Sequence, residues 1–420
     1  MVHEKQYWKQ VFWMATILAF GFGLLGFFDR MANGHLHADY GSYVPWGLWV
    51  AGYIYLIGLS AGAFLMSALV YVFRIEAFEK IGRLALLTAL ATLIGALLCI
   101  WFDLGHMGRA WRLVARTNFG SVMGWMAWLY GSYFVLLLFE FRFATRAELT
   151  AHHSVRTTSP LVQKLVGFDP TQPEAHPVEK DLKVLRILGS VGIPLAIAFH
   201  GSVGAIFGSV GARPYWNSGL TPIIFLVGAA TSGGALLALV TAVFGIRTQR
   251  EQDRRIVYLI GRLVLVLLAM DVLLEWSEMS IGLWSSLPSE SESIRLVLFG
   301  HFWWVFWFVH VGFGILVPGL LLLFKPRSLT AVALAGLLIT VTFISVRLNI
   351  VIPALAVPEL EGLRYAFTGP GLKFDYFPSL MEWQLFLFTI SLSAMVFLAG
   401  IQWLPVVDYS VENPGSEGGK

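Results

Sequence analysis

Long apolar stretches, separated by short polar segments, make up most of the chain. A helix needs about 17 to 25 predominantly apolar residues to cross a bilayer, and ten stretches meet that length. They cover residues 11–28, 46–73, 84–103, 121–142, 185–207, 219–245, 256–284, 296–324, 329–351 and 380–403. The pattern predicts an all-α polytopic membrane protein. Because the number of spans is even, both termini are expected on the same side.

Three short sequences occur twice at similar separations. Residues 81–84, 60–63 and 136–139 resemble residues 260–263, 232–235 and 321–324, at offsets of 172 to 185 residues. The matched spans are four apart and point the same way, which predicts two parallel-related four-helix bundles. A single transmembrane domain, 1–420, then contains a flanking helix (11–28), the two bundles (46–207 and 219–351), a second flanking helix (380–403) and a polar tail (404–420). Small residues at Gly58, Ser60, Gly62, Ser232, Gly233 and Gly234 are expected to serve close helix packing.

Charge gives the orientation. Only 13% of residues are charged and the formal net charge is +3, which gives no basis for nucleic-acid binding. Nineteen of the 29 Lys and Arg residues fall on the side that carries the termini, eight on the other side and two within spans. The positive-inside rule therefore predicts that both termini lie in the cytoplasm. The long connection 143–183 is expected to be a cytoplasmic surface loop, and 352–379 a lid on the outer side.

Three carboxylates interrupt the seventh apolar stretch. Asp271, Glu275 and Glu278 are spaced i, i+4, i+7, so a helix places them on one face. A charge at the centre of a bilayer costs about 2.5 to 3.5 kcal/mol, and intramembrane acids typically mark proton or ligand sites. The alternative is a polar seam satisfied by neighbouring helices.

Other polar groups lie at a similar depth. His200, Asp103, Arg347, Asn349, Glu382, Trp383 and His301 all fall near the outer ends of their spans, whereas the inner halves hold almost no ionisable group except Arg262. This grouping in an apolar wall suits a quinone, which has two carbonyls and exchanges two protons and two electrons. We expect His200 to donate to a quinone carbonyl, and Asp271, Glu275, Glu278 and Asp103 to relay protons.

Several alternatives stay open at this stage. His200 can also be a satisfied core histidine, and Arg347 can simply pair with Glu382 or Glu278. His310 falls on the helix face opposite His301 and is interpreted as packing. A haem b cytochrome would need facing histidines, for which only His200 and His301 qualify. A secondary transporter fits the repeat, although transporter sites lie near the midplane of the bilayer.

Cysteine content limits the metal chemistry of the chain. Cys99 is the sole cysteine and no C-x-x-C-H sequence occurs, so we expect no iron–sulfur cluster, no covalently attached haem and no metal site. Electrons for a quinone, either menaquinone or ubiquinone, must then come from or go to a partner protein.

Several motifs resemble the NrfD-type family of polysulfide reductase membrane subunits. The resemblance covers about residues 40–405 and matches the long ten-span branch, which includes membrane subunits of hydrogenases, of sulfite-reduction systems and of alternative complex III. In place of the family's Arg-Pro after Asp-Leu-Gly, this chain has His106-Met107. The motifs are residues 43–50 and 58–63, 103–105 with Arg109, Trp111 and Arg112, 118–125, 200–202, 212–216, 347–349 and 376–383.

The resemblance implies a haem-free, quinone-reactive subunit of a respiratory oxidoreductase. It adds Arg109, Arg112 and Trp125 to the quinone-binding candidates Arg347, Asn349, Glu382 and Trp383. It also implies a periplasmic ferredoxin-like iron–sulfur partner and, through it, a molybdopterin, hydrogenase or multihaem cytochrome subunit. We expect that partner on loops 104–120 and 352–379, with Arg109, Arg112 and Arg116 assisting its docking.

Overall fold

The computed structural model describes residues 2–152, 159–169, 177–245, 251–360, 362–367 and 369–407, without the side chains of residues 2–9, 152 and 252. Ten helices in this part of the chain are long and apolar enough to cross a membrane, so the protein is an all-α multi-pass membrane protein, as the hydropathy pattern predicts. The spanning elements are α1 (Val2–Asn33), α2 (Leu48–Tyr71), α3 (Gly82–Asp103), α5 (Val122–His152), α7 (Val178–Gly208), α8 (Thr221–Val240) continuing into η4 (Thr241–Gly245), α9 (Glu251–Leu283), η5 (Val305–Leu316) continuing into α11 (Val317–Phe324), α12 (Leu329–Ala356) and α14 (Leu380–Trp403).

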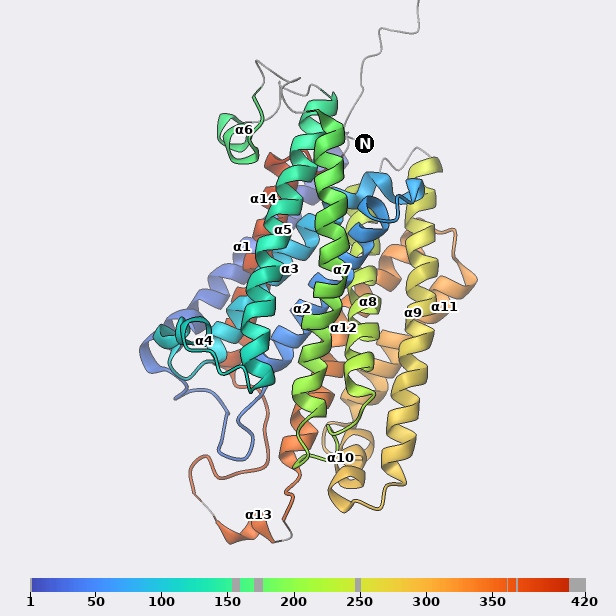
Figure 1. Ribbon diagram of the computed structural model, residues 1–420. Helices are drawn as coiled ribbons and strands as arrows, with labels where there is room; N and C mark the ends of the chain where they lie inside the picture. Colours follow the sequence, from blue (N-terminus) through green and yellow to red (C-terminus); the bar gives the residue numbers. More distant parts are fainter. Residues whose placement is uncertain are drawn as a thin grey trace, which may run out of the picture.

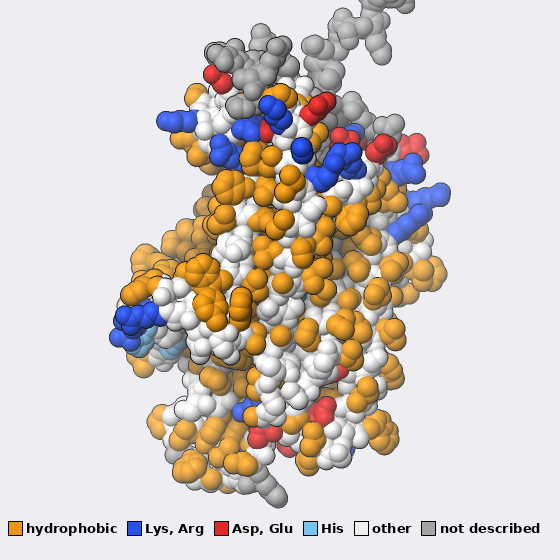
Figure 2. All heavy atoms as spheres, viewed as in Figure 1, with side chains coloured by type: hydrophobic (Ala, Val, Ile, Leu, Met, Phe, Trp, Pro, Cys, Tyr) orange, Lys and Arg blue, Asp and Glu red, His pale blue; other side chains and the backbone are white. Residues whose placement is uncertain are grey.

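The helices alternate in direction, which gives the molecule two ends. We call the end where α1 begins and α14 finishes the terminal side, and the opposite end the far side (Figure 1). Short helices decorate both ends: η1 (Glu76–Ile81) and α6 (Pro160–Val166) on the terminal side, and η2 (Met107–Arg109), α4 (Arg112–Ala115), α10 (Pro288–Phe299) and α13 (Leu363–Ala366) in the far-side connections. Figure 2 shows Lys and Arg side chains gathered at the terminal end, above a broad apolar band. That distribution is the one from which the sequence predicts orientation.

Contacts divide the spans into groups. α2, α3, α5 and α7 contact one another, as do α8, α9, α12 and the η5–α11 helix, and α2 and α7 pack on α8. α1 packs mainly on α14, which in turn contacts α3 and α2. α2 also contacts α12 across the two groups, so the division into two four-helix bundles and two flanking helices stays a prediction. The rotational relation between the two sets stays a prediction.

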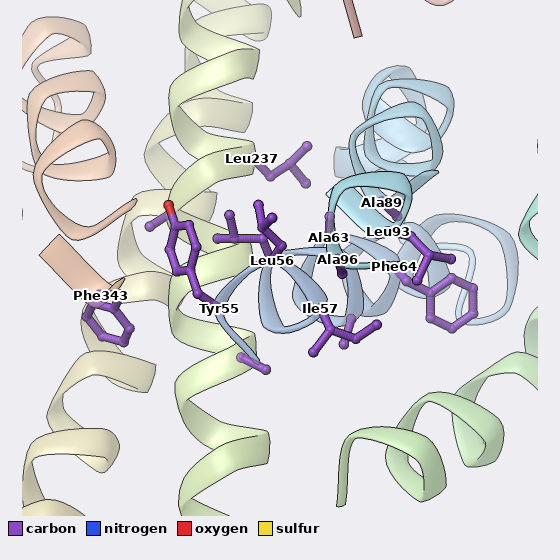
Figure 3. Close-up of a cluster of buried hydrophobic side chains, with 14 of the residues drawn as sticks. Tyr55, Leu56, Ile57, Ala63, Phe64, Ala89, Leu93, Ala96, Leu237 and Phe343 are labelled. Carbon is purple, nitrogen blue, oxygen red and sulfur yellow. The ribbon is translucent and has the colours of Figure 1, made fainter. Parts of the chain in front are cut away.

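Helix α2 lies at the centre of the molecule. It is apolar on all sides, as expected for a helix surrounded by others, and every residue from 47 to 64 is buried. Figure 3 shows its side chains pointing to several neighbours, with Leu56 below Leu237 of α8 and Phe64 beside Leu93 of α3. A Cβ on Gly62 would lie 2.2 Å from the Ala229 oxygen, and one on Gly233 would lie 2.6 Å from the Gly62 Cα. The predicted packing role of these small residues is confirmed.

Some boundaries differ from the hydropathy prediction. Helix α5 continues ten residues past 142, because its last turns are polar but still good helix formers, and Arg146 there binds Asp181 at the start of α7 through two hydrogen bonds (2.9 and 2.5 Å). The predicted span 296–324 joins two elements: α10 ends at Phe299, and the spanning helix begins at Val305. Most of the predicted tail, residues 408–420, lies outside the described residues.

Candidate functional site

A cavity lies among α8, α9, α10 and α12 in the far half of the membrane-spanning region. Apolar side chains form much of its wall, and polar side chains enter from α9 and α12. The apolar lining residues are Ile224, Phe225, Met279, Ile294, Phe343, Val346 and Ile350.

The three carboxylates of α9 all line this cavity. Asp271, Glu275 and Glu278 share one face over nearly two turns, as their spacing predicts, and Glu290 of α10 adds a fourth carboxylate. Asp271 is the most enclosed of the three on α9, and Glu278 lies nearest the far side. The acidic stripe therefore runs from the interior of the membrane toward the far surface.

Arg347 of α12 faces the acidic stripe across the cavity. It is only 2% exposed, and its guanidinium lies 5.0 Å from the centre of the Phe225 ring, a cation–π distance. A Cβ built on Gly228 would lie 2.8 Å from the guanidinium and 3.3 Å from an Asp271 carboxylate oxygen. Arg347 and Asp271 thus both lie next to Gly228, where a larger residue would press against them. Asp271 and Glu275 act electrostatically on Arg347, while pairing with Glu382 or Glu278 stays an alternative.

His310 belongs to the same site, contrary to its interpretation as packing. Its Nε2 lies 2.7 Å from Glu275 Oε2, and the ring is buried against Phe306 and Phe343. The reason is local geometry: residues 305–316 form a π-helix, whose turns contain more residues than those of an α-helix. Face assignments that assume 100° per residue therefore fail in this segment, and only a signal for the π-helix itself could have corrected them.

The connection between α7 and α8 closes the far end of the cavity. Tyr215 donates its hydroxyl to the Asn349 carbonyl (3.0 Å), and Trp216 donates its indole N–H to the Ile350 carbonyl (2.7 Å). Burial raises the pKa of Tyr215, with the nearby carboxylates adding to the shift, so the hydroxyl stays protonated. The Asn349 side-chain amide nitrogen lines the cavity without a hydrogen-bond partner among the described residues. It is a buried donor available to a ligand.

Near the far surface, Glu278 has a polar neighbour. Ser218 donates a hydrogen bond of 3.2 Å to Glu278 Oε2, and Glu290 lies close enough to act on it electrostatically. These groups connect the acidic stripe to the polar loop at residues 209–220.

His200 lies one layer behind the cavity wall. It is fully buried on α7, and its Nε2 is 2.8 Å from the carbonyl oxygen of Phe225. A carbonyl can only accept, so Nε2 carries the hydrogen, while Nδ1 has no partner among the described residues. Direct donation from His200 to a ligand stays a prediction, since the residue is not among those that line the cavity.

Asp103 and Glu382 lie in a second polar cluster, which we call the end-cap cluster, where α1, α3 and α14 meet on the far side. Arg30 donates to the Phe102 and Leu104 carbonyls (2.9 and 2.8 Å) and acts electrostatically on Asp103. Glu382 accepts from the Tyr376 hydroxyl (2.5 Å) and from the Ser379 and Asp39 N–H groups (2.8 and 3.0 Å). Burial and Glu382 together raise the pKa of Tyr376.

The remaining candidates lie on the outside of the protein. Trp383 is exposed on α14, Trp125 donates to the Phe119 carbonyl at the start of α5, and Arg109 and Arg112 are exposed in the loop after α3. His301 lies exposed on the turn before η5, far along the chain from the buried His200. Within the residues that the structure describes, no three His, Cys, Asp or Glu side chains are placed to hold a metal ion.

Comparisons with known proteins cover the same part of the chain. A model of the family described as polysulphide reductase, NrfD, matches residues 38–359, which include the cavity. The chain is 35% identical over 396 residues to a subunit of the selenate reductase of Mesobacillus selenatarsenatis, covering 93% of this chain and 92% of that protein.

Two further relatives extend over almost the full length. The chain is 29% identical over 414 residues to the Hdr-like menaquinol oxidoreductase integral membrane subunit of Archaeoglobus fulgidus (96% and 94% covered). It is 22% identical over 419 residues to the menaquinone reductase integral membrane subunit of Nitratidesulfovibrio vulgaris (96% and 93% covered).

Proposed function

The chain belongs to the polysulphide reductase NrfD family, and on this premise we propose that it is the quinone-reactive membrane subunit of a respiratory oxidoreductase complex. Two of its relatives are named for menaquinol or menaquinone, so a menaquinone is the quinone we propose. The chain would bind the quinone, exchange its protons, and leave the electrons to a partner subunit.

The observation that carries this proposal is the composition of the cavity. An amphipathic ring with two carbonyl oxygens needs apolar walls, a few hydrogen-bond donors and a group that can accept or supply protons. The cavity offers Phe225 and Phe343 as flat apolar surfaces, the unpaired Asn349 amide and Arg347 as donors, and the α9 carboxylates as proton carriers. The residues present therefore fit a quinone.

Each polar group has a distinct role in this proposal. Arg347 and Asn349 would hold the quinone oxygens and orient the ring. The Glu275–His310 pair, hydrogen-bonded at 2.7 Å, would hold a mobile proton next to the ring, because both partners are ionisable. Glu278, which accepts a hydrogen bond from Ser218, would extend this group of proton carriers toward the far end of the cavity. When bound, the quinone supplies the two-electron redox chemistry that these side chains lack.

Electron transfer requires a partner, which we propose to be an iron–sulfur subunit docked on the far side. The cavity lies in the far half, and loops 104–120 and 352–379 flank that end of the molecule (Figure 1). The excess of Lys and Arg on the terminal side supports cytoplasmic termini, which would make the far side periplasmic in a bacterial inner membrane.

The test is Glu275→Gln in the assembled complex, measured with a water-soluble menaquinone analogue. A glutamine keeps the shape of the side chain but cannot carry a proton, and loss of one positioned acid–base group costs about 10² to 10⁴ in rate. We expect quinone-linked turnover to fall by at least about 10², while the partner subunits still react with artificial dyes. The exposed Glu292→Gln on α10 is the matched control and should behave as wild type.

Binding is measured separately from turnover with a fluorescent hydroxyquinoline N-oxide, a quinol analogue. Its fluorescence should be quenched on the wild-type complex and restored by excess menaquinone analogue. A Glu275→Gln complex with wild-type turnover and an unchanged pH profile, or a wild-type complex that fails to bind the quinol analogue, would contradict the proposal.

A further inference from the structure

A second buried carboxylate lies far from the cavity, in the terminal half of the first helix group. Glu140 of α5 is 1% exposed, and its Oε1 has no hydrogen-bond partner among the described residues. The sequence predicts that the inner halves are almost free of ionisable groups apart from Arg262, and Glu140 corrects that prediction. It lies close to the end of its apolar stretch, where hydropathy does not reveal that α5 continues inward for three more turns.

Glu140 faces α7 and lies near the terminal end of α2. A Cβ on Gly189 of α7 would lie 3.6 Å from Glu140 Oε1, so the carboxyl faces the seam between α5 and α7. Tyr71 of α2 lies within electrostatic range of both Glu140 and Arg83, and Arg83 pairs with Glu148 toward the terminal surface. An unpartnered carboxyl in such a place calls for a bound water or a transferable proton.

Hydroxyl groups continue from Glu140 toward the far side. Tyr133 lies seven residues before Glu140 and thus on the same face of α5, about 10 Å further along at 1.5 Å per residue. The Tyr133 hydroxyl is 3.3 Å from Ser60 Oγ of α2, and Ser60 donates to the Ala89 carbonyl (2.8 Å). The Tyr130 side chain, one turn beyond, neighbours Tyr53 of α2, with 6.5 Å between the ring centroids.

His200 links this row to the cavity. Its neighbour Phe199 packs its ring on Tyr133 at 4.3 Å between centroids, and a Cβ on Gly58, two residues before Ser60, would lie 3.6 Å from His200 Cε1. On its other side, His200 is bound to the carbonyl of Phe225, whose ring lies under Arg347. The open Nδ1 lone pair makes His200 a proton acceptor between the first helix group and the cavity.

From these contacts we propose that Glu140, Tyr133, Ser60 and His200 form a proton path, bridged by water, between the terminal side and the cavity. The inference rests on the proposed function and deepens it by naming where the protons come from. For each quinone reduced, two electrons would arrive from the partner subunit and two protons from the terminal side. Oxidation of a quinol would return the two electrons to the partner subunit and the two protons to the terminal side. Turnover would then move protons and electrons through opposite ends of the protein.

The experiment uses the whole complex in proteoliposomes that contain a pH-sensitive dye, with menaquinone analogue as substrate. Glu140→Gln should slow quinone turnover by about 10² and remove its dependence on the pH of the terminal side. Tyr133→Phe should slow turnover less, because water can bridge a missing hydroxyl. Thr145→Val is the matched control, since Thr145 is also buried on α5 but bonds only to its own helix at the Phe141 carbonyl (2.7 Å).

Binding separates this inference from the proposed function. If the wild-type complex binds the quinol analogue and Glu140→Gln does so equally well but turns over slowly, the path is supported. Wild-type turnover in Glu140→Gln, with unchanged proton uptake from the terminal side, would overturn the path and leave the cavity assignment intact. Failure of the wild-type complex to bind the analogue would overturn both.

A chemical test covers the case in which the Glu140 variants do not assemble. A hydrophobic carbodiimide modifies protonated carboxyls in membranes, and the quinol analogue shields those of the cavity during treatment. We expect the peptide that contains Glu140 to be labelled and turnover to be lost after the analogue is removed. Turnover that survives the treatment would overturn the path.

Discussion

Two arginines are equally buried in this protein, but their partners differ. Arg30 in the end-cap cluster is 2% exposed and donates to two backbone carbonyls at the end of α3. Arg347 is also 2% exposed, yet it lies against an aromatic ring and beside Asp271 and Glu275 at a cavity. Backbone carbonyls cannot change protonation, whereas carboxylates can. A buried charge held by the backbone fixes a structure, and one held by other ionisable side chains can support proton chemistry.

The same contrast separates two glutamates. Glu382 accepts hydrogen bonds from the Tyr376 hydroxyl and from the backbone N–H groups of Asp39 and Ser379, and it forms a capping box with Ser379 at the start of α14. Glu275 instead bonds to a histidine on another helix and lines a cavity. Both residues lie in the far halves of their helices, so position along a helix alone does not identify the functional group.

The largest difference should appear when each arginine is replaced by glutamine. Arg347→Gln removes the cation beside Asp271 and Glu275, and we expect quinone turnover to fall by at least about 10² in a complex that still assembles. Arg30→Gln should keep turnover per assembled complex but lower stability, because each hydrogen bond from a charged donor contributes about 1.5 to 3 kcal/mol. Turnover assays and thermal unfolding of the detergent-solubilised complex measure the two effects. The reverse pattern would remove the distinction between the two clusters.

A smaller effect is expected from Gly228→Ala. The new Cβ would lie 2.8 Å from the Arg347 guanidinium, which can move aside only by leaving its place over Phe225. We expect affinity for the quinol analogue to fall by about tenfold with little change in stability, since misplacement of a positioning group is costly. Gly201→Ala on α7, where the Cβ meets open space, is the matched control. Equal affinities in the two variants would show that the position of Arg347 is not critical.

The smallest effect concerns the end-cap cluster and pH. Burial lowers the pKa of His35, and the nearby Arg30 lowers it further. The unfolded chain therefore binds a proton below about pH 6.5 that the folded protein resists, so this residue makes stability decline as pH falls below that value. His35→Gln should flatten the decline in a thermal unfolding series from pH 7.5 to 5, without altering turnover at neutral pH. An equally steep decline in the variant would assign the effect to another group.

The sequence was sufficient for the spans and for the acidic stripe. Ten apolar stretches, a helical spacing of three carboxylates and the depth of Arg347 and Asn349 all depend on distance along a helix, which the sequence fixes directly. Five of the residues that this reasoning names line the cavity: Asp271, Glu275, Glu278, Arg347 and Asn349. The others that it names, His200, Asp103, Glu382, Trp383 and His301, are not among the lining residues.

The sequence did not show which helices are neighbours, and so it did not show which residues at one level of the protein share a site. Asp103 and Glu382 lie in the far half of the protein like the cavity residues, but they lie where α1, α3 and α14 meet rather than among α8, α9 and α12. The sequence gives the height of a residue on its helix and leaves open which helix faces which. His310 was missed for a different reason, since the π-helix rotates it toward Glu275.

The pairing of α1 with α14 has a consequence for how the chain is made. Gly23 and Gly26 of α1 fit against the backbone of α14 at Phe388 and Leu385, so α1 finds its main neighbour only after all the spans between the two have been made. Until then α1 must reside alone in lipid, which its almost wholly apolar sequence allows. The Phe102 and Leu104 carbonyl groups that Arg30 binds are absent until α3 has been made. Insertion of α1 into the membrane therefore precedes its packing on α14, and the contact between these two helices forms late in folding.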